Sequence, residues 1–120
     1  MNKGRKITGG KYKKNRKKKS YEIKGQKRII KLGEEKRKEL RTRGGNKKIV
    51  LYATKFINVR VKGNKQKKVE IKNVIETPSN RFLARQNVMT KGAIVETELG
   101  KVRITNRPSQ EGSANGVLIE

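Results

Sequence analysis

The sequence predicts an all-β protein, a small antiparallel β-barrel that carries a long, basic and largely irregular N-terminal extension. Three observations predict this fold. Residues 1–48 hold 21 Lys or Arg and 4 Glu, whereas residues 49–120 hold 13 and 6, so the positive charge is concentrated early in the chain. The later part contains short segments rich in β-branched residues with glycines between them, and it contains no strongly amphipathic helix. We therefore place a basic extension at residues 1–45 and the barrel core at residues 46–120.

The beginning of the extension is not expected to fold alone. Its first 19 residues contain ten Lys or Arg and no acidic residue. Because these charges repel one another and few apolar side chains are present, burial cannot offset the entropy lost on ordering. The whole chain carries a net charge of +24 on 120 residues, which favours nucleic acid as the partner that orders this segment.

The next segment, residues 29–43, is ambiguous. Residues 33–40 (GEEKRKEL) could form two helical turns, but their apolar stripe is thin. The following Gly44-Gly45-Asn46 predicts a turn.

Strands are predicted from residue 47 onward. Apolar and polar residues alternate in residues 57–61 (INVRV) and 69–72 (VEIK), which indicates half-buried strands. Residues 81–89 fit either a helical turn or a strand. A loop is predicted at residues 107–116, followed by a closing strand at residues 117–119. A closed barrel would leave no exposed strand edge on this short chain.

The stretch AIVETELGKVRIT predicts a β-hairpin. A tight turn at Leu99-Gly100 would place Glu96 opposite Arg103 on one face and Val95 opposite Ile104 on the other. Such cross-strand pairs stabilise a hairpin by roughly 0.2–1 kcal/mol each. A slip of one residue would bring the two faces out of phase.

The few aromatic residues divide into two groups. Tyr12 and Tyr21 lie among cations, where they could stack on bases. Tyr52, Phe56 and Phe82 are expected in the core.

The residue inventory argues against an enzyme. The chain has no His, no Cys and no Asp, which are the usual components of nucleophile–base pairs and metal centres. We assign no catalytic residue, no metal ligand and no cofactor. There is no run of about 18 apolar residues, and no apolar segment follows the basic start, so neither a membrane span nor secretion is predicted.

Three basic features are candidate nucleic-acid contacts. In the extension, glycines in Thr8-Gly9-Gly10 let backbone N–H groups approach phosphates, although a flexible kink explains them equally well. The stretch RTRGGNKK offers guanidinium groups that grip phosphates bidentately, although it also reads as an ordinary turn. The RPSQ loop would present one arginine or would simply connect two strands. The candidate residues are Arg5, Lys6, Thr8, Gly9, Gly10, Lys13, Lys14, Arg16, Lys17, Lys18, Lys19, Arg41, Arg43, Gly44, Gly45, Asn46, Lys47, Lys48 and Arg107.

The order GRKITGG, NRKKKSYEI, RTRGGNKK and KGAIVETELGKVRITNRPSQEG closely resembles the S8e family of archaeal and eukaryotic small-subunit ribosomal proteins. The resemblance runs from about residue 4 to the end, and the length suits the compact archaeal form. It implies a β-barrel with a basic extension that threads over small-subunit ribosomal RNA. The loop reads RPSQEG where the family often reads RPGQDG, so this loop is expected to differ slightly. The family's glycine and basic positions correspond to Thr8, Gly9, Gly10, Arg16, Lys17, Lys18, Arg41, Arg43, Gly44, Gly45, Asn46 and Lys47.

Charge and resemblance together predict a structural constituent of the archaeal small ribosomal subunit that binds and stabilises its RNA. The expected partners are small-subunit ribosomal RNA and neighbouring ribosomal proteins in the cytoplasm, with no membrane and no small-molecule substrate. The alternative is a non-ribosomal architectural protein, a DNA-binding protein or an RNA chaperone. Preference for folded RNA over duplex DNA at equal salt would separate ribosomal from DNA binding. An RNA-modifying enzyme is the remaining rival, and it would lose activity on changing one Glu while still binding RNA.

Overall fold

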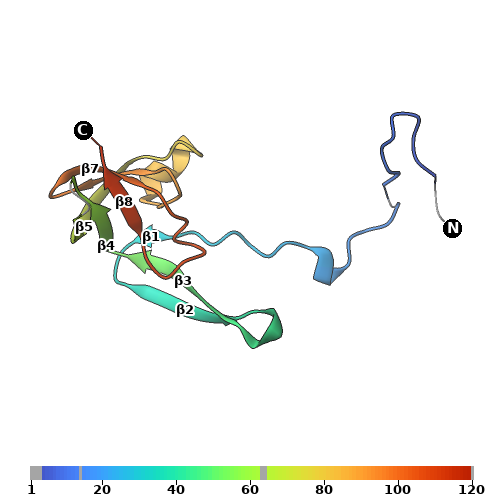
Figure 1. The fold of residues 1–120 in the computed structure, drawn as a ribbon, viewed down its shortest axis with the longest axis horizontal. Helices are drawn as coiled ribbons and strands as arrows, with labels where there is room; N and C mark the ends of the chain where they lie inside the picture. Colours follow the sequence, from blue (N-terminus) through green and yellow to red (C-terminus); the bar gives the residue numbers. More distant parts are fainter. Residues whose placement is uncertain (1–3, 14, 63–64, 120) are drawn as a thin grey trace.

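The chain folds into a closed five-stranded β-barrel with a three-stranded sheet beside it (Figure 1). The computed structural model describes residues 4–13, 15–62 and 65–119. The barrel has the order β4-β5-β6-β7-β8, and the second sheet has the order β1-β3-β2. The strands are β1 (Lys31–Leu32), β2 (Lys36–Arg41), β3 (Lys47–Thr54), β4 (Phe56–Arg60), β5 (Gln66–Glu76), β6 (Ile94–Thr97), β7 (Gly100–Ile104) and β8 (Asn115–Leu118), and the 3-10 helices are η1 (Ser20–Glu22), η2 (Arg43–Gly45) and η3 (Arg81–Gln86). The predicted all-β barrel is confirmed.

The core is formed by the alternating apolar side chains of the barrel strands. The alternation predicted for residues 57–61 and 69–72 is confirmed, because their apolar residues point inward while most of their polar neighbours stay exposed. Ile30 and Leu51 reach the same core from outside the barrel. The other members of the core are Ile57, Val59, Val69, Ile71, Val74, Met89, Ala93, Val95, Val102, Ile104 and Ala114.

Strand β8 closes the barrel. It pairs antiparallel with β7 and parallel with β4, so one of the barrel's strand pairs departs from the predicted antiparallel arrangement. The predicted closing strand is confirmed, although it starts at Asn115 rather than Val117. A Cβ atom at Gly116 would lie 2.5 Å from Cγ1 of Val102 and 2.9 Å from the carbonyl oxygen of Arg103. The strands can therefore approach this closely only because residue 116 has no side chain.

The β6–β7 hairpin is confirmed, but its predicted register is wrong by two residues. Val95 pairs with Val102 rather than with Ile104, and the turn consists of Glu98 and Leu99. The side chain of Thr97 reinforces the turn, since its Oγ1 donates a hydrogen bond to the Gly100 carbonyl at 2.9 Å. A shift of two residues keeps every side chain on its original face, so alternation could not reveal it.

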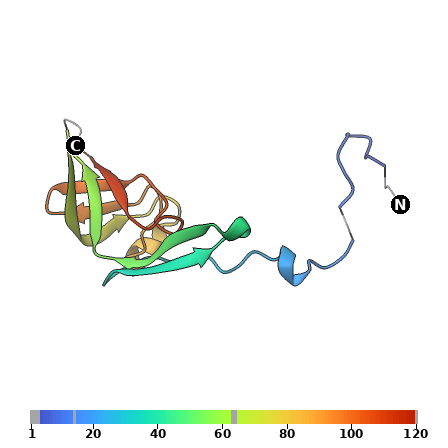
Figure 2. The ribbon, with the colours of Figure 1, turned by 60° about the horizontal axis from the view of Figure 1, so that its bottom comes forward.

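Strands β2 and β3 form a long hairpin beside the barrel (Figure 2). The helical alternative for residues 33–40 is therefore wrong. Pairing with β3, whose Val50 and Leu51 are buried, overrides the local tendency to form a helix. The predicted Gly-Gly-Asn turn is confirmed at the tip of this β2–β3 hairpin. The predicted boundary after residue 45 falls at this tip and stays a prediction.

The N-terminal part lies away from the barrel. Both views show it leaving toward the same end of the molecule as the β2–β3 hairpin (Figures 1 and 2). Residues 4–13 and 15–27 are all exposed. The radius of gyration is 19.5 Å, whereas a compact chain of this length has about 14 Å. None of these residues belongs to the buried core.

The segment left open between helix and strand forms η3. Phe82 in this helix is 62% exposed and Phe56 is 39% exposed, so the prediction that both lie in the core is wrong. Each ring is instead covered by a cation, with Arg81 over Phe82 at 5.4 Å and Lys68 over Phe56 at 4.6 Å. The third aromatic, Tyr52, is half-buried.

Candidate nucleic-acid interface

The predicted Thr-Gly-Gly segment forms a tight turn near the start of the chain. Lys6 N donates to the Gly10 carbonyl at 2.9 Å, and Gly9 N donates to the Lys6 carbonyl at 2.8 Å. Gly9 has a φ of 79°, a conformation that glycine adopts without strain. Arg5 closes the turn from the side, with NH1 donating to the Gly9 carbonyl at 2.9 Å. The turn therefore gathers basic side chains at one exposed place.

Arg16 is held by a carboxylate. Its two terminal nitrogens donate to the two Glu22 oxygens at 2.9 and 2.7 Å, and the Lys19 amide donates to Oε2 at 3.0 Å. The Arg16 hydrogen bonds, followed by the Lys19 amide, lower the pKa of Glu22, while slight desolvation opposes them. A phosphate would therefore have to displace Glu22 in order to take Arg16 bidentately.

The predicted cations of the second cluster meet at the tip of the β2–β3 hairpin. Arg41 ends β2 and lies directly opposite Lys47, the first residue of β3. The intervening loop is closed by Thr42 N, which donates to the Asn46 carbonyl at 2.7 Å. Asn46 Nδ2 in turn donates to the Arg43 carbonyl at 3.3 Å. The loop thus brings three exposed cations to one end of a paired ribbon.

Two glycines make this loop possible. Gly44 and Gly45 have φ values of 75° and 77°, in the region where other residues are strained. The cations of the tip are only weakly engaged within the chain. Lys47 Nζ lies 2.7 Å from Glu39 Oε1, but both side chains are exposed, so the pair is worth little and is easily exchanged.

The RPSQ loop is fastened rather than free. Its Pro108 carbonyl accepts from Leu51 N of β3 at 3.2 Å, and its Ser109 carbonyl accepts from Arg28 NH1 at 3.2 Å. Lys48, which was predicted to bind nucleic acid, is half-buried and donates to Gln110. Arg107 remains exposed at the start of this loop.

The candidate residues therefore do not form one site. One group lies along the extension between Arg5 and Lys19, and another lies at the tip of the β2–β3 hairpin (Figure 1). Arg107 lies in the RPSQ loop, where it lines a hollow together with Lys91. Lys14 lies outside the described residues. Sequence reasoning did not single out Arg28, which ties the extension to the RPSQ loop. Arg28 directly precedes the apolar pair Ile29-Ile30, and this pair could have indicated that the folded part of the chain begins there.

The fold and these two cationic projections define a small, basic, all-β protein. The model of the family "Ribosomal protein S8e" matches residues 1–119, and the chain belongs to this family. It is 48% identical to small ribosomal subunit protein eS8 of Nanoarchaeum equitans over 95% of this chain and 91% of that protein. The corresponding proteins of Staphylothermus marinus and Methanococcus aeolicus are 47% and 45% identical, over 97% and 96% of this chain and 92% and 91% of their own lengths.

The family confirms the predicted resemblance and makes the chain a ribosomal protein rather than an enzyme. The archaeal relatives agree with the predicted archaeal type. Within residues 4–13, 15–62 and 65–119, no helix is long and apolar enough to cross a membrane. The same residues contain no group of three His, Cys, Asp or Glu side chains placed to hold a metal ion.

Proposed function

We propose that this ribosomal protein is a structural constituent of the archaeal small ribosomal subunit and that it binds small-subunit ribosomal RNA through two contacts. The first contact is the basic extension, and the second is the Arg/Gly-rich tip of the β2–β3 hairpin. The protein would act in the cytoplasm beside other small-subunit proteins. The boundary after residue 45 belongs to this proposal, because it separates most of the RNA-binding cations from the barrel.

The observation that carries the proposal is the placement of the cations. All described residues of the extension before Arg28 are exposed, and none of them belongs to the buried core of the barrel. The hairpin tip holds Arg41, Arg43 and Lys47 on a pair of strands. This hairpin points toward the same end of the molecule as the extension (Figure 2). Exposed cations that contribute nothing to the core favour phosphate neutralisation as their role.

The two contacts would bind differently. The hairpin tip is held by strand pairing and by backbone hydrogen bonds, so its backbone loses little conformational entropy on binding and mainly its side chains have to be ordered. The extension has only local turns, so RNA must order it as it binds. Neutralised phosphates would let RNA segments lie close together, and selectivity would come from RNA shape more than from base reading.

The test is binding of the full chain to archaeal small-subunit ribosomal RNA, to an unrelated folded RNA of equal length and to duplex DNA, each across a salt series. The expected result is tight binding to the ribosomal RNA that persists at salt concentrations where both controls are released. Equal affinities that fall together with salt would overturn the proposal and leave a generic polycation. Preference for the DNA duplex would favour the architectural DNA-binding alternative.

A pair of variants tests the hairpin tip. Arg41→Gln with Arg43→Gln should reduce the salt slope for ribosomal RNA by about 1.4–1.8, since each phosphate contact accounts for roughly 0.7–0.9. The matched control is Arg85→Gln with Arg103→Gln, which removes the same charge from exposed positions of η3 and β7. Equal effects of the two pairs would mean that the tip is not a contact.

A further inference from the structure

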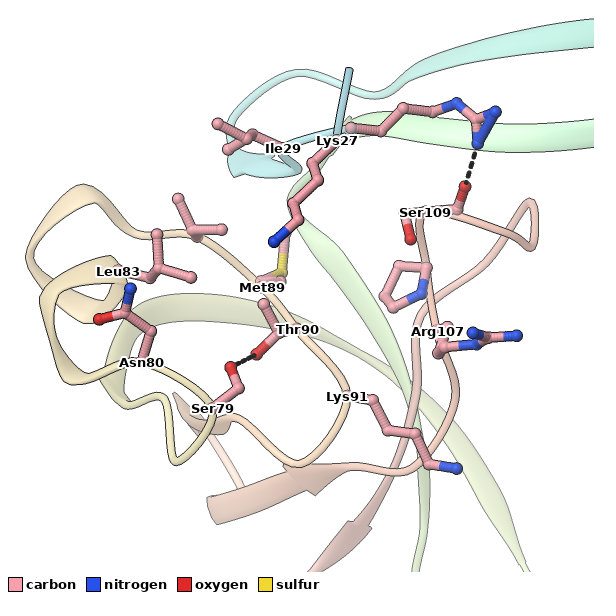
Figure 3. A pocket seen from close by; sticks show the side chains of 13 residues that line it. Lys27, Ile29, Ser79, Asn80, Leu83, Met89, Thr90, Lys91, Arg107 and Ser109 are labelled. Atoms are coloured by element: carbon pink, nitrogen blue, oxygen red, sulfur yellow. Dashed lines mark hydrogen bonds between the residues drawn. The ribbon is translucent and has the colours of Figure 1, made fainter. Parts of the chain in front are cut away.

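A hollow of about 470 Å³ lies where the extension meets the barrel (Figure 3). Its walls come from three places distant in sequence, namely residues 27–29, the segment 79–91 that contains η3, and the loop 107–109. Apolar side chains line much of it, with the buried Met89 at the floor, the half-buried Leu83 beside it and the exposed Ile29 at the edge. Met89 is only 2% exposed and belongs to the barrel core, so the floor is held rigidly.

The rim of this hollow is cationic. Lys27, Arg28, Lys91 and Arg107 line it, and none of its lining residues is acidic. Arg28 is committed to the Ser109 carbonyl, but Lys91 and Arg107 are exposed. Figure 3 shows the Lys27 side chain reaching over the hollow toward the region of Asn80 and Met89.

Polar groups also stand at the edge of the apolar floor. The hydroxyls of Ser79 and Thr90 share a hydrogen bond at 3.2 Å, and both line the hollow. Asn80 is fixed in place because its Oδ1 accepts from Phe82 N at 3.0 Å. An apolar floor with a few oriented polar groups and a cationic rim is typical of a site for a flat, partly apolar anion.

We propose that this hollow binds one unstacked nucleotide of RNA, with the base over Leu83 and Met89 and its phosphate between Lys91 and Arg107. Single-stranded RNA offers bases that have left the helical stack, and cations take the phosphates. Here the face of one such base would be buried against aliphatic side chains. The inference rests on the proposed function, because it names a further contact with the same class of partner. It extends the RNA-binding surface from the projections to the barrel itself.

A neighbouring hollow favours a nucleic-acid strand over a free metabolite. This second hollow, of about 420 Å³, shares Lys27, Arg28 and Ser109 with the first and continues along residues 25 and 26 to Gln110. Gln110 contacts Lys48 of the β2–β3 hairpin. A backbone leaving the first hollow would therefore find a polar, cation-lined path toward the hairpin. An acidic peptide would also suit the cationic rim, so a peptide is one of the ligands to be tested.

Met89 provides a direct reporter of the base. The chain has two methionines, Met1 and Met89, so methionine-methyl NMR of the full-length protein gives one signal at the floor and one at the start of the chain. Adenosine 5′-monophosphate should shift the Met89 methyl in a saturable way, whereas ribose 5-phosphate should move only the amides of Lys91 and Arg107. A Met89 methyl that is silent with the nucleotide, or equally shifted by ribose 5-phosphate, would overturn the proposal. A Met89 methyl that answers a Glu-Leu-Glu peptide but no nucleotide would assign the hollow to a protein partner.

A matched pair of variants tests the contact in RNA. Leu83 is half-buried at the edge of the hollow, and Leu83→Glu should lower the affinity for a single-stranded oligoadenylate on the order of tenfold, because it removes an apolar contact of the base and adds a negative charge beside the phosphate. Leu99→Glu, in the exposed β6–β7 turn, makes the same change elsewhere and should have little effect. If Leu83→Glu fails to fold, the exposed residues Lys91 and Lys72 provide a second pair of variants. Lys91→Ala should lower the affinity for the oligoadenylate severalfold, whereas Lys72→Ala should leave it unchanged. Equal effects of the two members of a pair would refute the site.

The salt-series assay on the same protein separates this inference from the proposed function. Preference for ribosomal RNA with a silent Met89 methyl would reject the hollow alone. A responsive Met89 methyl without that preference would reject the ribosomal RNA contact alone.

Discussion

Removal of residues 1–19 separates RNA binding from folding more sharply than any point substitution. The described residues of this segment, 4–13 and 15–19, are all exposed and take no part in the core, so the free energy of unfolding of the barrel should change by no more than about 0.5 kcal/mol. The same deletion removes ten Lys or Arg. If every one of them contacts a phosphate, the logarithmic salt slope of ribosomal RNA binding should flatten by about 7–9.

The measured change in the salt slope of RNA binding is proportional to the number of phosphate contacts that the deletion removes. Arg16 already pairs with Glu22, so its contribution includes the loss of that pair and should be smaller than that of a free cation. The assay is equilibrium binding of the truncated and full-length chains at several salt concentrations, with urea unfolding of both proteins in parallel. A truncated chain that unfolds would place the segment in the folded core and refute the boundary. An unchanged slope in a folded truncated chain would refute the contact.

A charge-matched comparison guards against effects of length. Lys17, Lys18 and Lys19 changed together to Gln should flatten the slope by about 2–3. The same change at Lys65, Lys67 and Lys72 on the barrel removes three exposed charges outside both proposed contacts and should leave the slope near that of the full chain. Equal flattening in the two triple variants would mean that only total charge matters.

Three further predictions concern single residues. Gly116→Ala should lower the free energy of unfolding by about 1–3 kcal/mol in urea titration, because the added Cβ would lie 2.5 Å from Val102 Cγ1. Gly45→Val should weaken ribosomal RNA binding severalfold in the equilibrium assay, since φ is 77° there and a side chain costs about 1–2 kcal/mol. Glu22→Gln should free Arg16 and steepen the salt slope by up to about 0.7–0.9. In the unchanged protein, the lowered pKa keeps Glu22 ionised until the pH falls below the range usual for a Glu, so any gain in RNA affinity that comes from release of Arg16 should appear only there and should be absent from Glu22→Gln.

Controls for two of these changes lie elsewhere in the chain. A Cβ at Gly25 would meet no atom within 4 Å, so Gly25→Ala, which serves as a control for the stability measurement only, should leave the free energy of unfolding unchanged. Glu98→Gln removes the same charge from the β6–β7 turn without releasing an arginine. A Gly116→Ala protein as stable as its Gly25→Ala control would contradict the close packing at the barrel seam. A Gly45→Val protein with full affinity would contradict the role of the tip, and equal slopes for Glu22→Gln and Glu98→Gln would show that Arg16 is not held back.

The barrel could be predicted from the sequence because its strands obey a period of two. In residues 57–61 and 69–72 apolar and polar residues alternate, so the sequence itself shows which side chains face the core and which face the solvent. The register of β6 against β7 could not be predicted in the same way. Pairing Val95 with Val102 or with Ile104 leaves the same faces inside, and only the turn at Glu98-Leu99 distinguishes the two.

Strand β2 was missed for a different reason. Its sequence KRKELR has the composition of a helix surface, and its strand state depends on a partner that begins six residues after its end, at Lys47. The exposure of Phe56 and Phe82 was missed because large aromatics are usually buried, whereas here Lys68 and Arg81 cover them. The candidate cations were easy to find, since charge is visible in sequence. Their division between a paired hairpin and an unpaired extension was not visible, because it depends on β2.

The hairpin tip and the extension would contribute differently to the affinity for RNA and to its salt dependence. A phosphate contact at the hairpin tip draws on a loop that Thr42, Asn46 and the strand pairs already hold in place, so most of its electrostatic gain appears as affinity. A phosphate contact in the extension must first offset the ordering of exposed residues that take no part in the barrel core. Both kinds of contact release counterions and therefore contribute equally to the salt slope. The extension should thus dominate the salt dependence through its number of charges, while each cation of the hairpin contributes more to the affinity.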